Sequence, residues 1–100
     1  MNSENAYMYL FARTDLSHQQ QIVQTAHAAA LIGERYHGNT YAVLCGAKSE
    51  DHLHIISDYL EQVGIAYALF FEPDLNSYTA IATEPLQGKR RGAMKKFKLM

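Results

Sequence analysis

Three polar side chains near the start of the chain have types and a spacing suited to chemistry on a substrate. Gln20, Gln24 and His27 stand at i, i+4 and i+7, so on a helix they share one face. Amide groups donate and accept hydrogen bonds, and an imidazole can hold or transfer a proton. We expect this face to point outward, with a solvated helix surface as the alternative and, for His27, a half-buried structural position. The positions expected to pack inward are Val23, Ala26, Ala30 and Gly33.

The other chemically distinctive segment is the basic C-terminal end. Residues 1–85 hold all ten acidic residues and three basic ones, a net charge of −7, whereas the last fifteen residues carry a net charge of +6. Such a segment favours binding to phosphate groups in a sequence-independent way, and a solvated basic tail is the alternative. The six cations are Lys89, Arg90, Arg91, Lys95, Lys96 and Lys98.

Metal and cofactor sites are not indicated. His52 and His54 are two apart on a predicted helix and therefore point to different sides, and Cys45 is the single cysteine. Gly-rich phosphate loops and Gly-x-Ser-x-Gly elbows are absent. We therefore expect no metal and no cofactor. Cys45 lies in an apolar run, where a buried thiol behaves as a small hydrophobe and suits a reducing compartment.

The expected location of the protein rests on two features that the sequence does not show, a secretion signal and a membrane span. The opening residues are polar and do not resemble a secretion signal. No apolar run approaches the roughly 18 residues of a membrane span. We expect a cytoplasmic protein without a membrane partner.

The elements that position these residues follow from the hydrophobic pattern. Apolar runs over 6–12, 40–46, 65–71 and 78–83 predict four strands. Ser17 with Gln20 forms a capping box that begins a helix running to about Tyr36, with 37–39 as its stop. Ser49 and Gly64 bracket a second helix, whose apolar stripe is Leu53, Ile56, Leu60 and Val63.

The order of elements predicts a single α/β domain over residues 1–100. A short basic helix is expected over 87–97, and the two strands before it should be antiparallel neighbours. The order is then β-α-β-α-β-β-α, a three-layer sandwich. With 48% hydrophobic residues the chain can fill one core.

Several segments resemble a known family. Residues 13–16 (Arg-Thr-Asp-Leu) and 24–29 (Gln-Thr-Ala-His-Ala-Ala) resemble the Arg-Asn-Asp-Leu and Gln-Cys-x-His-Ala-Ala segments of the archaeal and eukaryotic, or second, type of peptidyl-tRNA hydrolase. Residues 79–85 are similar to that family's Thr-Val-Leu-x-Ile-Gly-Pro segment, and 97–100 to its Leu-Lys-Leu-Tyr ending. The resemblance covers nearly the whole chain and implies a mixed four-stranded sheet with flanking helices.

The resemblance also implies an activity and a set of site residues. The family's enzymes hydrolyse the ester that joins a peptide to the 3′ ribose of tRNA, without a metal. Carried over by position, the catalytic residues are Gln24, Glu72, Thr79 and, where the family has lysine, Gln20. Glu72 is expected to handle the attacking water, the two glutamines to donate to the substrate carbonyl or ribose, and Thr79 to position them.

The remaining site residues are expected to bind the tRNA. They are His18, His27, Lys89, Arg90, Arg91, Lys95 and Lys96. His18 supplies a cation when protonated, and the lysines and arginines contact phosphates.

The departure at Gln20 leaves alternatives to hydrolysis open. A neutral amide in place of an ammonium weakens stabilisation of the ester's oxyanion, and one lost donor costs about 10²–10³ in rate. A tRNA-binding or protein-binding module on the same fold is therefore the alternative function. A homodimer with a purely structural role is a further possibility.

Overall fold

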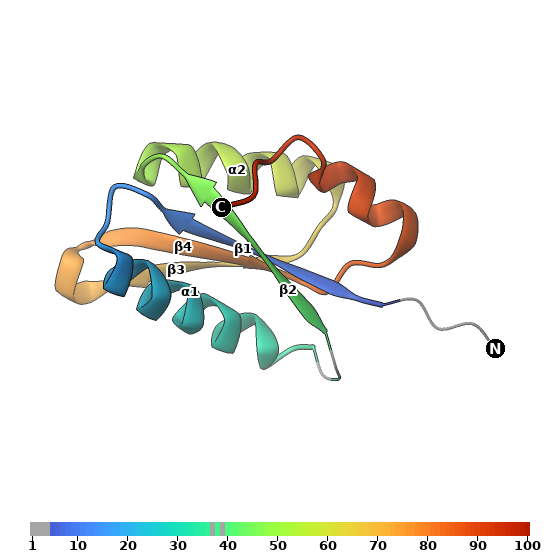
Figure 1. Cartoon of the computed structure of the whole chain (residues 1–100), viewed down its shortest axis with the longest axis horizontal. Coiled ribbons are helices and arrows are strands. Elements are labelled where there is room, and N and C mark those ends of the chain that lie inside the picture. Colours follow the sequence, from blue (N-terminus) through green and yellow to red (C-terminus); the bar gives the residue numbers. More distant parts are fainter. Residues whose placement is uncertain (1–4, 37, 39) are drawn as a thin grey trace.

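Four strands form one mixed sheet, as the apolar runs predict (Figure 1). The computed structural model describes residues 5–36, 38 and 40–100. The strands are β1 (Tyr7–Arg13), β2 (Tyr41–Ala47), β3 (Tyr67–Glu72) and β4 (Ser77–Thr83), and their order in the sheet is β2-β1-β4-β3. β1 pairs parallel with β2 and antiparallel with β4, while β3 and β4 are antiparallel neighbours. The predicted central place of the first strand is therefore confirmed.

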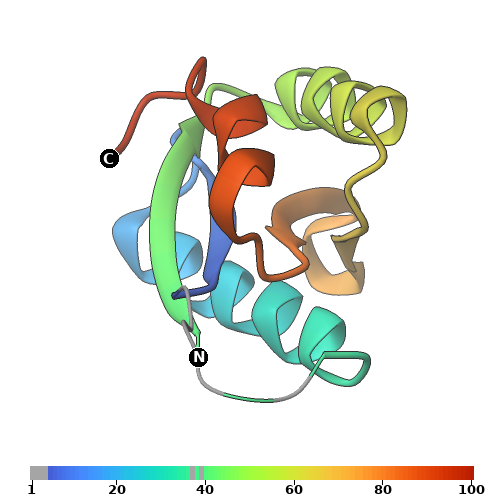
Figure 2. The same cartoon turned by 90° about the vertical axis from the view of Figure 1, so that its right-hand side faces the viewer.

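Helices cover both faces of the sheet, so the predicted three-layer α/β sandwich is confirmed (Figure 2). α1 (His18–Gly33) packs on one face against β1, β3 and β4. α2 (Glu50–Val63) lies on the other face, together with the 3-10 helix η2 (Gly88–Met94). A second short 3-10 helix, η1 (Pro73–Leu75), connects β3 to β4. The predicted basic C-terminal helix thus forms as a 3-10 helix. Among the described residues, no helix is long and apolar enough to cross a membrane.

The helix boundaries follow the predicted caps, with one exception. Ser17 Oγ accepts from the backbone amide of Gln20 at 3.1 Å, and Ser49 Oγ accepts from the backbone amide of His52 at 3.2 Å. The predicted capping box at Ser17 is half formed, because Gln20 Oε1 accepts from Gln24 and not from the Ser17 backbone. Gly64 ends α2 with φ of 75°, in the left-handed region that glycine adopts without strain. α1 ends at Gly33, earlier than the predicted end near residue 36, because the chain tightens there into a turn. Positions 37 and 39 of the predicted stop lie outside the described residues.

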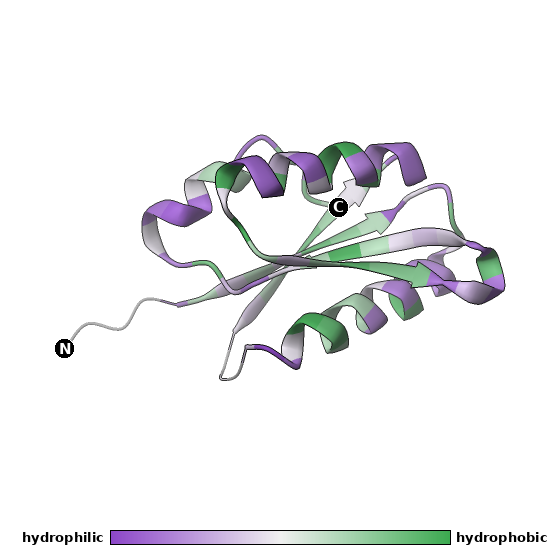
Figure 3. Ribbon diagram, turned by 180° about the vertical axis from the view of Figure 1, so that it is seen from behind, coloured by the Kyte–Doolittle hydropathy of each residue, from purple (hydrophilic) through white to green (hydrophobic). Residues whose placement is uncertain are grey.

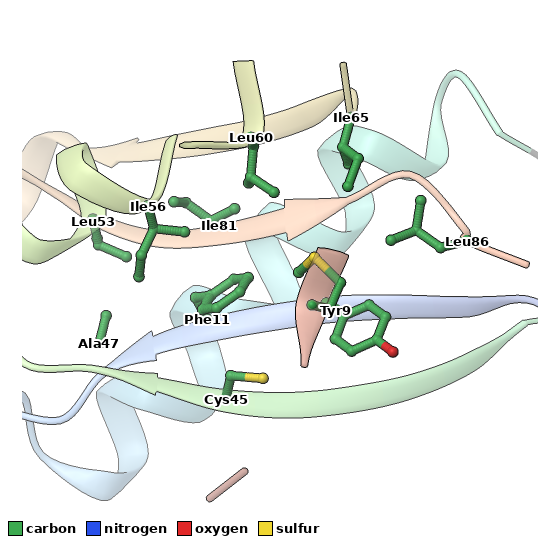
Figure 4. Packing of buried hydrophobic residues seen from close by; sticks show 11 residues of the cluster. Tyr9, Phe11, Cys45, Ala47, Leu53, Ile56, Leu60, Ile65, Ile81 and Leu86 are labelled. Atoms are coloured by element: carbon green, nitrogen blue, oxygen red, sulfur yellow. The ribbon is translucent and has the colours of Figure 1, made fainter. Parts of the chain in front are cut away.

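The two faces of the sheet have different cores. The α2 side is packed with large apolar side chains, including Phe11, Leu53, Ile56, Leu60 and Ile81 (Figure 4). The α1 side is lined mainly by alanines, and its buried members are Ala28, Ile32, Ala68, Ala80 and Ala82. Seen from behind, the apolar strands lie between more polar helix surfaces (Figure 3). Small side chains let α1 approach the sheet closely, so buried polar groups of the helix can reach partners on the strands.

Cys45 is buried on the α2 side, as predicted. Burial raises the pKa of its thiol to about 11, so the thiol stays protonated near neutral pH. A protonated, inaccessible thiol is a packing residue and not a nucleophile.

Candidate functional site

Four side chains from three separate segments meet at the end of the sheet where β1 and β3 finish and β4 begins. The Gln24 amide nitrogen donates to Gln20 Oε1 at 2.9 Å and to Glu72 Oε1 at 3.1 Å. Thr79 Oγ1 donates to Gln24 Oε1 at 2.8 Å. We call these four residues the amide–carboxylate cluster. The structure thus brings together the four residues to which the resemblance assigns a catalytic role.

Gln24 reaches the cluster because α1 turns a polar face toward the sheet. Its side chain is 2% exposed, whereas Val23 is 46% exposed and Ala26 and Ala30 lie at the surface. The predicted outward orientation is therefore wrong for Gln24, and the predicted inward packing is wrong for these three residues. Burying a polar group costs little when all its hydrogen bonds are made, and each polar atom of the Gln24 amide has a partner.

Thr79 reaches the cluster through an irregularity in β4. Phe70 pairs with Ala80 and Phe71 with Tyr78, so the register skips Thr79. Ala80 belongs to the core under α1, whereas Tyr78 packs on the opposite side against α2. Because an extra residue in one strand breaks the alternation of side chains, Thr79 joins Ala80 on the α1 side. Its side chain is fully buried there.

Glu72 supplies the charge of the cluster. It lies at the end of β3, partly exposed, and its second oxygen, Oε2, accepts from the backbone amide of Asp74 at 3.3 Å. Hydrogen bonds from Gln24 and from that amide lower the pKa of Glu72, with a smaller contribution from the charge of His27. The carboxylate is therefore ionised at neutral pH and can orient a water or accept its proton.

The two predicted histidines lie on either side of the cluster. His27 is exposed, as predicted, and its ring stacks on Phe70 with centroids 4.7 Å apart. His18 is the first residue of α1 and lines a separate cavity of about 340 Å³ between that helix and the β1–β2 edge, with Ile22 and Leu44 among its walls. His27 is thus a neighbour of Glu72, and His18 is not part of the cluster.

The predicted phosphate-binding cations lie away from the cluster. They belong to η2 and the residues after it, on the α2 side and near the opposite end of the sheet (Figure 1). Arg90 forms an ion pair with Glu84 at 2.9 Å, and Lys96 lies over the ring of Tyr59. Lys89, Arg91 and Lys95 line a groove together with tyrosines of β1.

Arg13, the cation at the end of β1, makes its contacts outside the cluster. Arg13 forms a double contact with Asp15 through Nε and Nη2, at 2.9 and 2.8 Å, and also donates to the backbone oxygen of Tyr78. Among the described residues, the hydrogen-bond partners of the cluster include no lysine or arginine. The cluster therefore consists of one carboxylate surrounded by neutral amide and hydroxyl groups.

Comparison with known proteins adds a likeness of fold. No family model matches the chain, and no curated protein matches it. The chain is similar to the solved structure of a protein of unknown function, Atu0240, from Agrobacterium tumefaciens strain C58, with a TM-score of 0.68 and 18% sequence identity. The match covers 98% of this chain and 99% of that one. At this identity the likeness establishes a shared fold alone.

Proposed function

We propose that the amide–carboxylate cluster hydrolyses the ester of peptidyl-tRNA. The observation that carries the proposal is the hydrogen-bonded convergence of Gln20, Gln24, Glu72 and Thr79. These residues come from one helix and two strands, and their positions match those that the resemblance to the second type of peptidyl-tRNA hydrolase assigns to catalysis. Two of them, Gln24 and Thr79, are buried polar residues.

The hydrogen bonds assign a role to each member of the cluster. Both N–H groups of the Gln24 amide are engaged, so Gln24 positions its neighbours and does not donate to substrate. Thr79 fixes the orientation of that amide from the opposite side. Gln20 accepts through its oxygen, which leaves its amide nitrogen as the donor available to a substrate carbonyl.

Glu72 is the base in this scheme. Ester hydrolysis requires a water whose proton is removed as the carbonyl is attacked, and a tetrahedral oxyanion follows. The ionised Glu72 carboxylate takes that proton while the Gln20 amide donates to the oxyanion. The bond from the carbonyl carbon to the ribose oxygen then breaks, the ribose oxygen takes up the proton, and the peptide leaves as a carboxylic acid.

A second candidate function is binding without hydrolysis on the same fold. The absence of lysine and arginine among the cluster's described hydrogen-bond partners favours it, because a neutral donor stabilises an oxyanion less than a cation does. Burial of Gln24 and Thr79 also favours it, since the cluster exposes only Gln20 and Glu72 in part.

One experiment separates the two functions. Pure protein is incubated with tRNA carrying a radiolabelled N-acetyl-amino acid, and release of the labelled acid is compared with release in buffer at several salt concentrations. We expect release above buffer, with intact tRNA as the second product. Retention of intact substrate in a salt-sensitive complex supports the binding module and overturns hydrolysis.

A further inference from the structure

A broad groove lies on the α2 side of the sheet, at the end opposite the amide–carboxylate cluster. It has a volume of about 1080 Å³ and runs between η2 and the first residues of β1 and β2. Tyr7 and Tyr9 of β1 form one wall, while Lys89, Arg91 and Lys95 form the other. The proposed hydrolysis uses none of these residues at the cluster, so the groove needs an explanation of its own.

The charges in the groove have one sign. Its described lining residues include three cations and no acid. Lys89 and Lys95 are exposed, and neither side chain has a hydrogen-bond or ion-pair partner among the described residues. By contrast, Arg90 is engaged by Glu84 and by the backbone oxygen of Gly64 outside the groove. The arrangement of η2 therefore directs free positive charge into the groove, where it complements an anion.

Arg91 is held in place by aromatic side chains. Its guanidinium carbon lies 3.6 Å from the ring centroid of Tyr7, and its Nε donates to Tyr9 Oη at 3.0 Å. A guanidinium fixed in this way loses less freedom when it binds phosphate, and its planar fork matches two phosphate oxygens. Its planar faces also stack on nucleic-acid bases.

An aromatic surface continues from this arginine to the edge strand. Tyr41 of β2 stacks on Tyr7, with ring centroids 5.3 Å apart and planes inclined by 24°. Tyr41 is 57% exposed. An exposed tyrosine ring beside a row of cations is the combination used for single-stranded nucleic acids, in which bases stack on aromatic rings while phosphates contact lysine and arginine.

We propose that this groove binds single-stranded RNA. Lys89, Arg91 and Lys95 contact consecutive phosphates, and one base stacks on Tyr41. The aromatic surface distinguishes this ligand from an acidic peptide, which would use the cations alone. The proposal is separate from hydrolysis at the cluster, because it requires neither the ester nor Glu72.

The test measures binding of a fluorescent single-stranded RNA of about eight nucleotides without any ester-linked amino acid. Fluorescence anisotropy is followed from about 50 to 200 mM salt. The double variant Lys89→Ala/Lys95→Ala is expected to bind the RNA at least about tenfold more weakly than wild type. The magnitude of the slope of log affinity against log salt should decrease by about 1.4, because each lost phosphate contact on a single strand contributes about 0.7.

A matched control removes the same charge elsewhere. Arg35→Ala/Lys48→Ala takes two exposed cations from outside the groove, one shortly after α1 and one directly after β2, and is expected to bind like wild type. Circular dichroism is used to check that both double variants are folded. Equal weakening in the two double variants would overturn the groove, because it would show attraction to net charge alone.

A second pair of variants tests stacking. Tyr41→Ala is expected to weaken RNA binding about tenfold, whereas Tyr41→Phe keeps the ring and binds like wild type. A labelled oligoglutamate peptide serves as the competing anion. If the peptide binds and the RNA does not, or if Tyr41→Ala binds RNA like wild type, the single-stranded RNA proposal is wrong.

Discussion

At the scale of single residues, Gln24 is the organiser of the candidate site. Its amide joins Gln20, Glu72 and Thr79, so three segments of the chain depend on one side chain. A buried network of this kind is stable only when every member is satisfied. The described residues contain no buried side-chain polar atom without a hydrogen-bond partner. The cluster is therefore preorganised, and the proposed hydrolysis uses its Gln20 amide nitrogen as a donor and its Glu72 carboxylate as a base.

The Gln20 position tests whether a missing cation limits the rate. Gln20→Lys places an ammonium one helical turn before Gln24, beside Glu72 and the expected oxyanion. We expect the release of acyl-amino acid to rise by about 10² or more, because a charged donor stabilises the oxyanion better than a neutral one. Single-turnover kinetics with acylated tRNA measure the change. Gln19→Lys adds the same charge at an exposed neighbouring position and should have little effect. Equal acceleration in both variants would point to general attraction of tRNA instead.

At the scale of elements, the irregularity in β4 decides which face Thr79 occupies. Regular alternation would place Thr79 with Ile81 under α2, away from Gln24. The register skip between Phe70 and Phe71 moves it to the α1 side. The turn after β3 contributes as well, because the Asp74 amide holds the second oxygen of Glu72. The irregularity in β4 and the turn after β3 therefore assemble the site together.

The N-terminal caps of the two helices allow a matched test of stability and activity. Ser17→Ala and Ser49→Ala each remove one cap hydrogen bond, so each is expected to lower the free energy of unfolding by about 1 kcal/mol. Urea denaturation measures this loss. Only Ser17 holds the first turn that carries Gln20, so only Ser17→Ala should also slow hydrolysis. A similar slowing in Ser49→Ala would mean that destabilisation, and not local geometry, affects the rate.

Sequence pattern was enough to predict the elements and their order. The caps at Ser17 and Ser49 and the stop at Gly64 were readable because each depends on neighbours within a few residues. The sequence did not predict which face of α1 packs on the sheet. The alanine-rich helix has no clear apolar stripe, and its buried face is set by partners on distant strands. The irregularity at Thr79 left no mark in the sequence.

Helical spacing alone pointed to Gln20 and Gln24, whereas Glu72, Thr79 and the catalytic roles were predictable only through family resemblance. The resemblance singled out the four cluster residues, but it did not separate the cations of the C-terminal end into different environments. Arg90 is taken by Glu84, Lys96 lies over Tyr59, and Arg91 stacks on Tyr7. Each of these contacts joins residues from different elements, so local sequence does not reveal them.

At the scale of the whole molecule, charge is divided between the two ends of the sheet. The end that holds the cluster carries Asp15, Glu72 and Asp74, while the groove at the opposite end is lined by cations. The net charges of −7 and +6 along the sequence are only partly separated in the fold, because Glu84 pairs with Arg90 and Lys98 lies beside Gly46 near the end of β2. The groove is nevertheless a surface whose described lining holds cations and no acid.

Paired carboxylates predict how stability depends on pH. The Arg13 guanidinium lowers the pKa of Asp15, and Arg90 lowers that of Glu84. The unfolded chain then binds more protons than the folded chain at acidic pH, so the stabilisation present near neutral pH is lost as pH falls through the folded pKa values. We expect the urea midpoint to be steady from about pH 7 to 5. It should then decrease as the pH is lowered through and below the usual pKa range of carboxyl groups.

Two variants test whether the Glu84 carboxylate causes this loss of stability at acidic pH. Glu84→Gln removes the carboxylate that pairs with Arg90 and should reduce the fall in the urea midpoint. Asp58→Asn removes an exposed carboxylate that has no hydrogen bond or ion pair with a described residue, and the fall should persist. An unchanged fall in Glu84→Gln would contradict the assignment.

The most direct test of the account is the single-turnover rate of ester hydrolysis by Glu72→Gln. This variant keeps the size of the side chain and an oxygen for the Gln24 hydrogen bond, but it removes the base. We predict a loss of about 10² or more relative to wild type, and an unchanged rate for Asp58→Asn on the opposite side of the sheet. Hydrolysis by Glu72→Gln at the wild-type rate would contradict the central claim.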